Sequence, residues 1–356
     1  QSLREESLSR IAKSHRVVIA RVNLVGGNDD LVFDGRSSAF SADGTMVARG
    51  AAFAEDLVNV DLALPSLQAV APDDVEPESE IWRALVLGTR DYVHKCGFTS
   101  VHLGLSGGID SSLVAAIAVE ALGPENVLGV LLPSPYTSAE SIEDARELAE
   151  NLGIRVECVP ISQIMKAFDG ALSDLFAGMR RDATEENLQA RIRGTVLMAL
   201  SNKFGSMLLS TGNKSEAAVG YCTLYGDTAG GLSVIGDLPK CMVYRICRWL
   251  NRKHPVIPER VLEKPPSAEL RPGQTDLETL PPYDLLDAIL YRYVDCSESP
   301  EEIIAAGYPA ENVYRVIQMV HSAEFKRRQA APGLKVSGRS FGVDWHMPIA
   351  AKPWWR

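Results

Sequence analysis

Apolar and polar positions follow two alternating patterns from about residue 81 onward. Short apolar runs are typical of buried strands, and they occur at residues 101–105, 127–132 and 156–159. Stretches with helical spacing or a high alanine content lie before and between them, at residues 81–96, 113–122 and 138–152. Strands that alternate with helices of this length predict an α/β fold, a doubly wound parallel sheet with right-handed crossovers and helices on both faces.

The preceding residues have a different texture. Residues 16–64 contain β-rich segments separated by Gly-Gly and Asp-Gly pairs, which predict turns. A stretch of this length gives a thin core by itself, so we expect it to be part of something larger. The acidic segment APDDVEPESE contains two prolines and lacks periodicity, as a linker does. The predicted organisation is a β-rich region at 1–70, a linker at 71–80, an α/β domain at 81–330 and a C-terminal tail at 331–356.

The stretch LGLSGGIDSSL at residues 103–113 joins the first strand of this pattern to a helix. Small residues at 106–108 allow the backbone to approach a ligand, and the free N–H groups and dipole of the helix favour an anion such as phosphate. A plain strand-to-helix turn, with Asp110 or Ser111 as the N-cap, is the alternative interpretation. The string SGGIDS is more specific than a lone G-x-G-x-x-G, and it lacks the G-K-[ST] of a P-loop.

The composition limits the classes of function. Hydrophobic residues make up 46% and charged residues 23% of the 356, as in soluble globular proteins. A net charge of −10 argues against a general nucleic-acid binder. No apolar run reaches the roughly 18 to 20 residues of a membrane helix, and residues 1–15 are too polar for a signal peptide. We therefore expect neither a nucleic acid nor a membrane as a partner.

Six cysteines are dispersed along the chain, at positions 96, 158, 222, 241, 247 and 296. They form no C-x-x-C pair and have no histidine at ligand spacing, so the sequence supports neither a zinc nor an iron–sulfur site. Dispersed cysteines in a chain of this size are typical of reduced core residues, which predicts a cytoplasmic protein. Cys96, at the end of a predicted helix, is accordingly expected to be buried.

The SGGIDS string resembles the loop of the N-type ATP pyrophosphatases, which holds the pyrophosphate that leaves when ATP adenylates a substrate. Three later segments narrow the resemblance: NLQARIR at 187–193, LSTGNKSE at 209–216 and GYCTLYGD at 220–227. In this order, and together with the loop, they resemble the NAD synthetase family over residues 81 to about 330. The resemblance implies a Rossmann-type fold of the adenine nucleotide alpha hydrolase kind.

The family resemblance implies a ligase that converts nicotinate adenine dinucleotide (deamido-NAD) to NAD. Because a carboxylate is a poor acyl electrophile, the substrate is first joined to AMP from ATP, and ammonia then displaces AMP. Both steps move negative charge, so Mg²⁺ and cations near the phosphates are expected to contribute much of the catalysis. The family also implies at least a dimer formed through the synthetase domain.

The resemblance assigns roles residue by residue. Asp110 and Glu216 are the expected Mg²⁺ carboxylates and, with Lys240, the catalytic set. Positions matching ATP contacts are Gly104, Leu105, Ser106, Gly107, Gly108, Ile109, Asp110, Ser111, Ser112, Thr211, Lys240 and Ser267. Positions matching the dinucleotide substrate are Asn187, Arg191, Glu216, Tyr221, Cys222, Thr223, Leu224, Asp227 and Lys326. Taken alone, Glu216 and Lys240 are more typical of a helix-surface carboxylate and a solvated lysine, whereas Asp110 within its loop is more typical of a functional residue. Lys326 lies in a charge run that is typical of a solvated face.

Two departures and the N-terminal region favour the glutamine-dependent branch. Leu224 and Gly231 stand where the ammonia-only branch has a lysine and an aspartate. The segment ARVNLVGGNDDLVFDGRSSAF resembles the C-terminal part of a nitrilase-like glutaminase domain, an α+β fold that would supply ammonia. Such domains use a Glu, Lys and Cys set, and no cysteine precedes Cys96. The chain as written is therefore expected to use ammonia only, whereas its parent is expected to use glutamine.

Two alternatives remain open at this point. Other SGGxDS pyrophosphatases adenylate xanthosine monophosphate, aspartate or RNA bases, and they share the loop without the NLQARIRG and STGNKSE pairing. A non-catalytic nucleotide sensor could also retain the loop.

Overall fold

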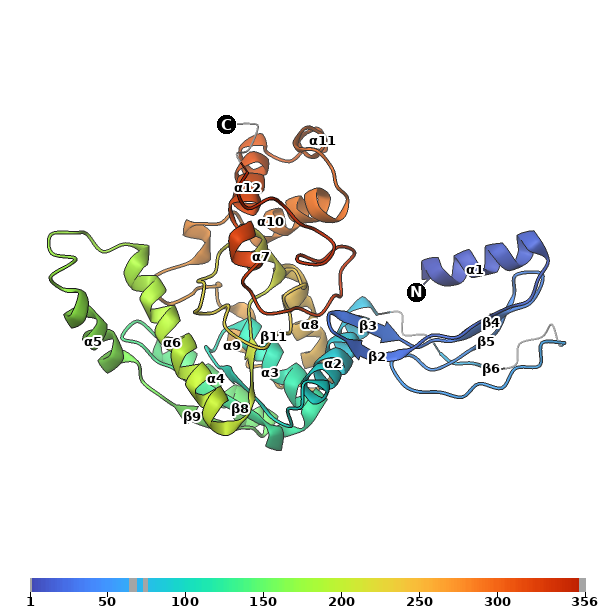
Figure 1. Ribbon diagram of the computed structural model, residues 1–356, viewed down its shortest axis with the longest axis horizontal. Helices are drawn as coiled ribbons and strands as arrows, with labels where there is room; N and C mark the ends of the chain where they lie inside the picture. Colours follow the sequence, from blue (N-terminus) through green and yellow to red (C-terminus); the bar gives the residue numbers. More distant parts are fainter. Residues whose placement is uncertain (1, 64–68, 73–75, 352–356) are drawn as a thin grey trace. The chain divides into compact units, whose positions relative to one another are not determined.

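The computed structural model describes residues 2–63, 69–72 and 76–351. The chain divides into two compact units, residues 1–92 (unit 1) and 93–356 (unit 2) (Figure 1). The boundary between the two units, after residue 92, lies within helix α2 (Pro77–Lys95). This helix begins four residues before the predicted start at Ile81.

Unit 1 begins with helix α1 (Ser2–His15) and continues as short strands. A four-stranded sheet has the order β1-β4-β5-β6, and β2 and β3 form a separate hairpin. The strand bounds are Ile19–Arg21 (β1), Val25–Asn28 (β2), Leu31–Asp34 (β3), Ser38–Phe40 (β4), Met46–Arg49 (β5) and Ala69–Val70 (β6). Ala39, Val47 and Ala48 form a small buried core between strands β4 and β5.

Three features of unit 1 differ from the prediction. Gly26 and Gly27 lie within strand β2 and do not form a turn; the hairpin turns instead at Asp29, which has a φ of 54°. The predicted β-rich segment at 55–64 forms no strand over its described residues 55–63, and helix α1 was not anticipated. The Asp43-Gly44 turn is confirmed, because the N–H of Ser41 donates to the carbonyl of Thr45 across it.

Unit 2 contains a five-stranded parallel sheet in the order β11-β10-β7-β8-β9. Its strands are Val101–Gly104 (β7), Val127–Leu131 (β8), Arg155–Cys158 (β9), Met207–Ser210 (β10) and Leu232–Ser233 (β11). Numbered within the sheet, the order is 3-2-1-4-5, the arrangement of a doubly wound Rossmann-type fold. Strands β7 and β10 therefore flank the point where the strand order reverses, and ligands of such sheets bind beyond the carboxyl ends of the strands there.

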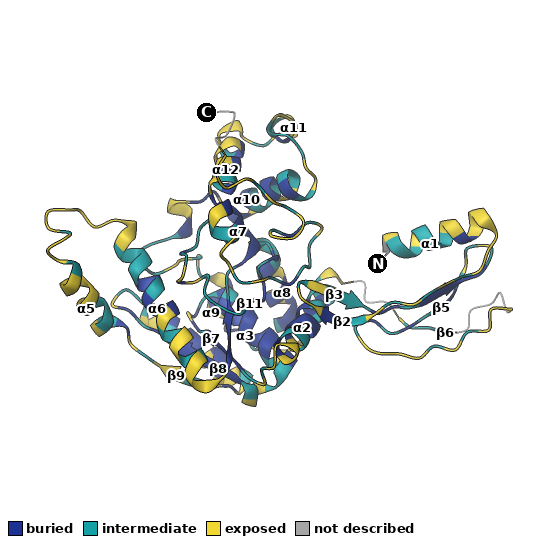
Figure 2. Ribbon diagram, in the orientation of Figure 1, coloured by how far each residue is buried: buried dark blue, intermediate teal, exposed yellow. Residues whose placement is uncertain are grey.

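Four helices connect the first four strands of this sheet: α3 (Ile109–Leu122), α4 (Ala139–Leu152), α5 (Ser162–Leu172) and α6 (Ala183–Phe204). Right-handed crossovers place α3 and α4 on one face and α6, which packs against β7 and β10, on the other. Helix α3 is apolar nearly all round, and most of its residues are buried (Figure 2). It begins at Ile109, four residues before the predicted start.

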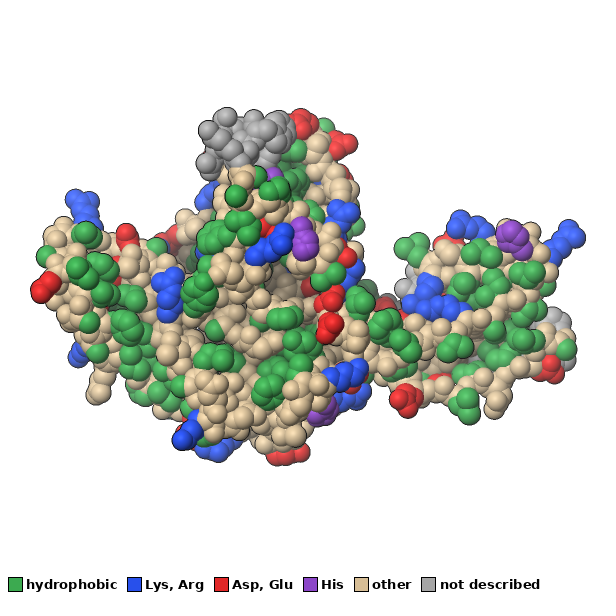
Figure 3. All heavy atoms as spheres, in the orientation of Figure 1, with side chains coloured by type: hydrophobic (Ala, Val, Ile, Leu, Met, Phe, Trp, Pro, Cys, Tyr) green, Lys and Arg blue, Asp and Glu red, His purple; other side chains and the backbone are tan. Residues whose placement is uncertain are grey.

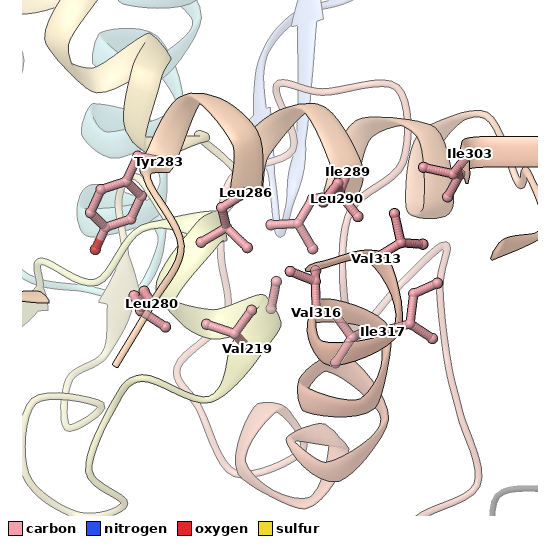
Figure 4. Packing of buried hydrophobic residues seen from close by; sticks show 12 residues of the cluster. Val219, Leu280, Tyr283, Leu286, Ile289, Leu290, Ile303, Val313, Val316 and Ile317 are labelled. Atoms are coloured by element: carbon pink, nitrogen blue, oxygen red, sulfur yellow. The ribbon is translucent and has the colours of Figure 1, made fainter. Parts of the chain in front are cut away.

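A second core of unit 2 is helical. It packs α7 (Lys214–Val219) against α10 (Tyr283–Leu290), α11 (Pro300–Ala305) and α12 (Ala310–Ser322), with Leu286, Val316 and other apolar side chains interdigitating between them (Figure 4). The remaining elements are the 3₁₀ turns Pro124–Asn126 and Asp276–Glu278, the helices α8 (Lys240–Lys253), α9 (Glu259–Glu263) and α13 (Glu324–Arg327), and a π-helical turn at Tyr291–Asp295.

The six cysteines are free, but the prediction that they are core residues was wrong for the three that are exposed. Cys247 is buried, Cys222 and Cys241 are partly buried, and Cys96, Cys158 and Cys296 are exposed. For Cys96 the reason is its position at the end of α2, where the following Phe98 and not the thiol is drawn inward.

Surface charge and helix length bear on the partner predictions. On the face of unit 2 drawn in Figure 3, Lys and Arg side chains are dispersed among other residue types. Within the described residues, every helix is too short or too polar to cross a bilayer.

Candidate active site

The loop after strand β7 approaches helix α4 so closely that one glycine is obligatory. Gly107 has a φ of +74°, and a Cβ there would overlap the carbonyl oxygen of Ser141 and lie 2.9 Å from its Cα. Gly108 has an ordinary φ of −93° and is the N-cap of α3, without a side-chain cap. The capping role considered for Asp110 or Ser111 is therefore wrong, because both lie inside the first turn.

The serines of this loop stabilise its own turn. The Oγ atoms of Ser111 and Ser112 donate to the carbonyl of Gly108, at 3.0 and 2.8 Å, and Ser106 Oγ accepts from the Gly108 N–H at 3.2 Å. The uncapped α3 N-terminus thus opens at the switch point of the sheet, a geometry suited to an anion.

Asp110, Glu216 and Lys240 meet at this point although 130 residues separate the first from the last. Lys240 Nζ donates to Asp110 Oδ2 and lies 3.4 Å from Glu216 Oε1. Its side chain is only 3% exposed, so the interpretation of Lys240 as a solvated lysine is wrong. The surface interpretation of Glu216 is wrong for the same reason, because its side chain is 19% exposed and faces this cation.

Asn213 links the two carboxylates. Its Nδ2 donates to Asp110 Oδ1 at 2.9 Å, while its Oδ1 accepts from the N–H of Glu216 at 3.0 Å. Asn213 and Glu216 form a capping box at the start of α7. The first turn of this short helix therefore fixes the direction in which Glu216 faces Asp110.

Burial dominates the electrostatics of the cluster. It raises the pKa of Glu216 to about 8, against the opposing effect of Lys240 and with a further rise from Asp110. Burial alone would lower the pKa of Lys240, but the charges of Asp110 and Glu216 outweigh it and raise that pKa. Lys240 therefore stays a fixed cation next to two carboxyl groups.

Two adjoining cavities open at the carboxyl ends of β7, β8 and β10. The larger measures about 260 Å³ and has mainly aliphatic walls from strand ends and α6; among the predicted residues it is lined by Gly104, Leu105, Ser106, Thr211, Asp227 and Ser267. The smaller measures about 150 Å³ and is more polar; among the predicted residues it is lined by Ser106, Asp110, Ser111, Thr211, Glu216, Cys222, Asp227 and Lys326. Ser106, Thr211 and Asp227 line both, so one ligand could span them.

The residues predicted for the dinucleotide lie together in one network around the segment 220–228. Thr223 Oγ1 donates to Asn187 Oδ1 at 2.7 Å, and Thr223 N–H donates to Asp227 Oδ1, also at 2.7 Å. Arg191 Nε donates to the carbonyl of Leu224 at 3.2 Å. Tyr221 OH donates to Asp276 Oδ1 at 3.2 Å. Of the residues predicted for the dinucleotide, Glu216, Cys222, Asp227 and Lys326 line these two cavities, and Gly226 and Thr228 of the same segment line them as well.

Asp227 and Lys326 both line the smaller cavity, Asp227 from the segment 220–228 and Lys326 from helix α13. Desolvation raises the pKa of Asp227 to about 6. The residue is nevertheless exposed to solvent, and it borders both cavities. Lys326 Nζ donates to the carbonyls of Gly220 and Cys222, at 2.6 and 2.7 Å. The interpretation of Lys326 as part of a solvated face is therefore wrong.

Ser267 lies in an exposed segment held by its own turn. Its Oγ donates to the carbonyl of Gln274 at 2.5 Å and accepts from the N–H of Glu269 at 3.1 Å. Glu269, which has a φ of +48°, accepts hydrogen bonds from Ser138 and Ser141 at the start of α4. This attachment places Ser267 at the wall of the larger cavity.

Four residues of the site were not singled out from the sequence. Arg193 lines the larger cavity with its Nε donating to the carbonyl of Leu132, and burial lowers its pKa against the opposing charges of Glu269 and Asp227. Asn213 could have been found from the Asn-x-x-Glu capping pattern. Glu269 lines the larger cavity and accepts from Ser141, and Arg327 lines the smaller cavity and donates to the carbonyl of Ala218. Because these partners are distant in sequence, no local pattern indicated either residue.

Comparison with known proteins decides the family. The sequence model of the NAD synthase family matches residues 81–330, which comprise most of α2 and unit 2 up to residue 330. The chain belongs to the NAD synthase family. The match covers the SGGIDS loop and each of the three segments on which the resemblance was based.

Curated relatives and solved structures agree. The chain is 58% identical over 352 residues to a glutamine-dependent NAD(+) synthetase of Synechocystis sp., covering 98% of this chain and 63% of that protein. It is 50% identical to the Thermotoga maritima protein of the same name, with 98% and 67% covered. The structure of glutamine-dependent NAD+ synthetase from Acinetobacter baumannii in complex with ADP is 45% identical, with a TM-score of 0.71 over 98% of this chain and 64% of that one.

Shorter family members also align. NMN synthetase from Francisella tularensis is 27% identical with a TM-score of 0.61, over 74% of this chain and 98% of that one. The NH3-dependent NAD synthetase from Campylobacter jejuni is 27% identical with a TM-score of 0.58, over 72% and 96%. The chain thus spans the shorter enzymes almost entirely and a little under two thirds of the first glutamine-dependent relative.

Proposed function

We propose that the chain is the synthetase part of an NAD(+) synthase and catalyses the ATP-dependent amidation of deamido-NAD to NAD. The observation that carries the proposal is the cluster of Asp110, Glu216 and Lys240 beside the uncapped N-terminus of α3, at the switch point of the sheet. A buried cation and two carboxylates beside free helix N–H groups suit a reaction in which a carboxylate and a phosphate form a mixed anhydride and pyrophosphate leaves.

The proposed reaction has two balanced steps. A carboxylate oxygen of deamido-NAD attacks the α-phosphorus of ATP, the bond to the β-phosphate oxygen breaks, and pyrophosphate leaves with its electron pair. Ammonia then attacks the acyl carbon, AMP leaves with the carboxylate oxygen, and one proton is released. In the first step, Lys240 supplies a positive charge next to the leaving pyrophosphate. Its low exposure to solvent strengthens the attraction between this charge and the developing anion.

The residues present fit Mg²⁺. The ion commonly takes one or two protein carboxylates and completes its shell with substrate phosphates and water. Asp110 and Glu216 supply such a pair, because both carboxyl groups face the same Lys240 Nζ and therefore lie close together. When bound there, the ion would neutralise phosphate charge.

The two cavities suggest how the substrates are arranged. We assign the larger, mostly aliphatic cavity to the adenosine of ATP, with Thr211 and Ser267 at its polar edge. We assign the smaller cavity to the reacting groups and the near end of deamido-NAD, with Cys222, Asp227 and Lys326 facing it. The segment 220–228, which carries Cys222 and Asp227, would then be held in place by other predicted dinucleotide residues, namely Asn187, Arg191, Tyr221, Thr223 and Leu224.

The remaining expectations complete the proposal. We infer a cytoplasmic homo-oligomer built on a dimer of the synthetase domain. Unit 1 is interpreted as the C-terminal part of a glutaminase domain, which provides ammonia from glutamine in the longer relatives that bear this name. The division into a region at 1–70, a linker at 71–80, a domain at 81–330 and a tail at 331–356 stays a prediction.

The test is mass-spectrometric detection of NAD from deamido-NAD, ATP, Mg²⁺ and ammonium, with AMP and pyrophosphate counted in parallel. We expect equal amounts of NAD, AMP and pyrophosphate. Because an NMN synthetase is among the structural neighbours, nicotinate mononucleotide is supplied in a second reaction. A preference for the mononucleotide would replace the proposed substrate. ATP binding without release of AMP or pyrophosphate would instead indicate a sensor, and product from xanthosine monophosphate or aspartate another pyrophosphatase.

A further inference from the structure

The C-terminal segment 335–340 is attached to the first residue of helix α7 by a buried cation. Lys214 Nζ donates to Ser337 Oγ at 2.6 Å and to the carbonyl of Arg339 at 2.7 Å. It also lies 3.1 Å from Asp237 Oδ1. The side chains of Lys214 and Asp237 are 5% and 3% exposed, so this ion pair is nearly removed from solvent.

Asp237 holds the same segment from the other side. Its Oδ2 accepts from the N–H groups of Val336 and Ser337, at 2.9 and 2.8 Å, and its Oδ1 accepts from Ser337 Oγ at 2.8 Å. Ser337 is therefore the shared link, because its hydroxyl accepts from Lys214 and donates to Asp237. A buried carboxylate with four partners tolerates little displacement of any of them.

The attachment lies directly behind the catalytic cluster. Lys214 and Glu216 are two positions apart on α7, and side chains with that spacing point to different sides of a helix. Lys214 thus faces the C-terminal segment while Glu216 faces Asp110 and Lys240. Helix α7 has only six residues, so its own hydrogen bonds do little to fix its direction.

We propose that the C-terminal segment 335–340 positions Glu216 for catalysis, with Lys214 and Ser337 as positioning residues that act through the first turn of α7. Loss of the attachment would let that turn rotate and move Asn213 and Glu216 relative to Asp110. The part of the proposal that concerns catalysis rests on the proposed function, whereas the coupling of the segment to α7 does not.

The chain offers a matched pair of variants. Ser337→Ala removes the shared hydroxyl. Ser340→Ala removes a hydroxyl of the same segment that donates to Asp344 at 3.0 Å, whereas Lys214 donates to Ser337 and Arg339. Ser337→Thr keeps the hydroxyl and serves as the rescue variant. Lys214→Met is the stronger change, but it leaves Asp237 without its cation and can prevent folding.

The first measurement is hydrogen exchange of the full chain, which needs no substrate. We expect the amides of residues 215–220 to exchange about tenfold faster in Ser337→Ala than in the unaltered chain, and unchanged in Ser340→Ala and Ser337→Thr. Equal exchange at 215–220 in Ser337→Ala and Ser340→Ala would overturn the coupling, whether or not the chain makes NAD.

The second measurement is the Mg²⁺ concentration that gives half-maximal pyrophosphate release. Partners that orient a metal ligand typically contribute 10- to 100-fold to affinity or activity, so we expect a rise of about tenfold in Ser337→Ala and restoration in Ser337→Thr. A lower unfolding temperature with an unchanged Mg²⁺ requirement would show that the attachment is only structural and would overturn the catalytic part. Inactivity of the unaltered chain would count against the proposed function and leave the exchange result to decide the coupling.

Discussion

At the scale of single residues, the candidate site depends on long-range pairing of charges. Lys240 and Lys326 each stood in a sequence context typical of solvated side chains, yet the first pairs with Asp110 and the second donates to two carbonyls of the segment 220–222. Local sequence does not record which distant groups a lysine will meet, and this is why their burial could not be predicted. Asp110 was predictable because its functional context, the SGGIDS loop, is local.

Replacement of Asp110 tests the cluster most directly. Asp110→Asn keeps the size of the side chain but removes the charge that faces Lys240, and we expect pyrophosphate release to fall by about 10²- to 10³-fold. Glu120→Gln, on the exposed side of the same helix, is the control and should retain full turnover. Turnover of Asp110→Asn close to that of the unaltered chain at saturating Mg²⁺ would contradict the assignment.

The two glycines of the loop are expected to behave differently. Gly107→Ala introduces a Cβ against the backbone of Ser141 at a positive φ, so the free energy of unfolding should fall by more than about 2 kcal/mol. Gly108→Ala keeps an allowed φ, with Ser106 Oγ 3.2 Å from the new Cβ, and should cost less than about 1 kcal/mol. Denaturant unfolding of both variants measures the difference.

The ATP affinity of Gly108→Ala then reports on the loop itself. If the loop holds phosphate, a methyl group at its rim should raise the KM for ATP while the fold is retained. An unchanged KM would favour the interpretation of the loop as a plain turn.

At the scale of elements, hydrophobic periodicity predicted strands β7, β8 and β9 and helix α4 to within about two residues. It did not give the strand order, because periodicity shows which residues are buried and not which strands pair. The Gly-Gly pair at 26–27 predicted a turn that the structure does not have, because these glycines lie inside a strand that passes close to α2. A Cβ on Gly27 would lie 3.2 Å from the Cα of Gly88. Close packing favours glycine there, and in the sequence such a glycine is indistinguishable from a turn signal.

Strand β7 carries a buried histidine that links sheet stability to pH. His102 is fully buried, its Nε2 lies 2.9 Å from the carbonyl of Leu197, and its Nδ1 lies 2.9 Å from Ser206 Oγ. Because a carbonyl only accepts, Nε2 carries the proton and Nδ1 accepts from Ser206, so the neutral ring is fully paired. Desolvation lowers its pKa below the ordinary value, against the effect of the bond to Leu197.

A lowered pKa means that the unfolded chain binds the extra proton first as pH falls. The stability contributed by neutral His102 is therefore complete above the unfolded pKa of about 6.5 and is lost as pH falls from there through the folded pKa. We expect the free energy of unfolding to decline between pH 7 and 5.5 in the unaltered chain, and to decline less in His102→Gln. Equal slopes for both proteins would show that another group is responsible.

At the scale of the whole molecule, four local motifs predicted the family and strand–helix alternation predicted the α/β fold of unit 2, whereas the predicted division of the chain stays a prediction. Helix α2 starts at Pro77, inside the segment interpreted as a linker, because the acidic residues Glu78 and Glu80 occupy the first turn of a helix, where they are favourable. Acidic composition thus indicated a linker where it marks a helix start. Residues 73–75, the middle of the predicted linker, lie outside the described residues.

The choice of nitrogen donor, ammonium or glutamine, tests whether unit 1 can supply ammonia to unit 2. Hydrolysis of glutamine by a nitrilase-like site needs an activated thiolate, and none of the residues 1–92 is a cysteine. Cys96 is exposed but follows α2 in unit 2, and its neighbours His94 and Lys95 belong to the same helix end. We therefore expect a preparation of residues 1–356 to make NAD with ammonium and to make none with glutamine.

The experiment supplies glutamine as the sole nitrogen source and follows glutamate release together with NAD, in a preparation whose mass is verified. Cys96→Ser is the matched variant, because it removes the thiol nearest to unit 1 in sequence and should leave ammonium-dependent synthesis unchanged. NAD and glutamate produced in equal amounts from glutamine would disprove the expectation, and their loss in Cys96→Ser would identify the nucleophile. Synthesis with ammonium alone would mean that the motifs in unit 2 suffice for amidation and that the glutaminase function requires groups other than those in unit 1.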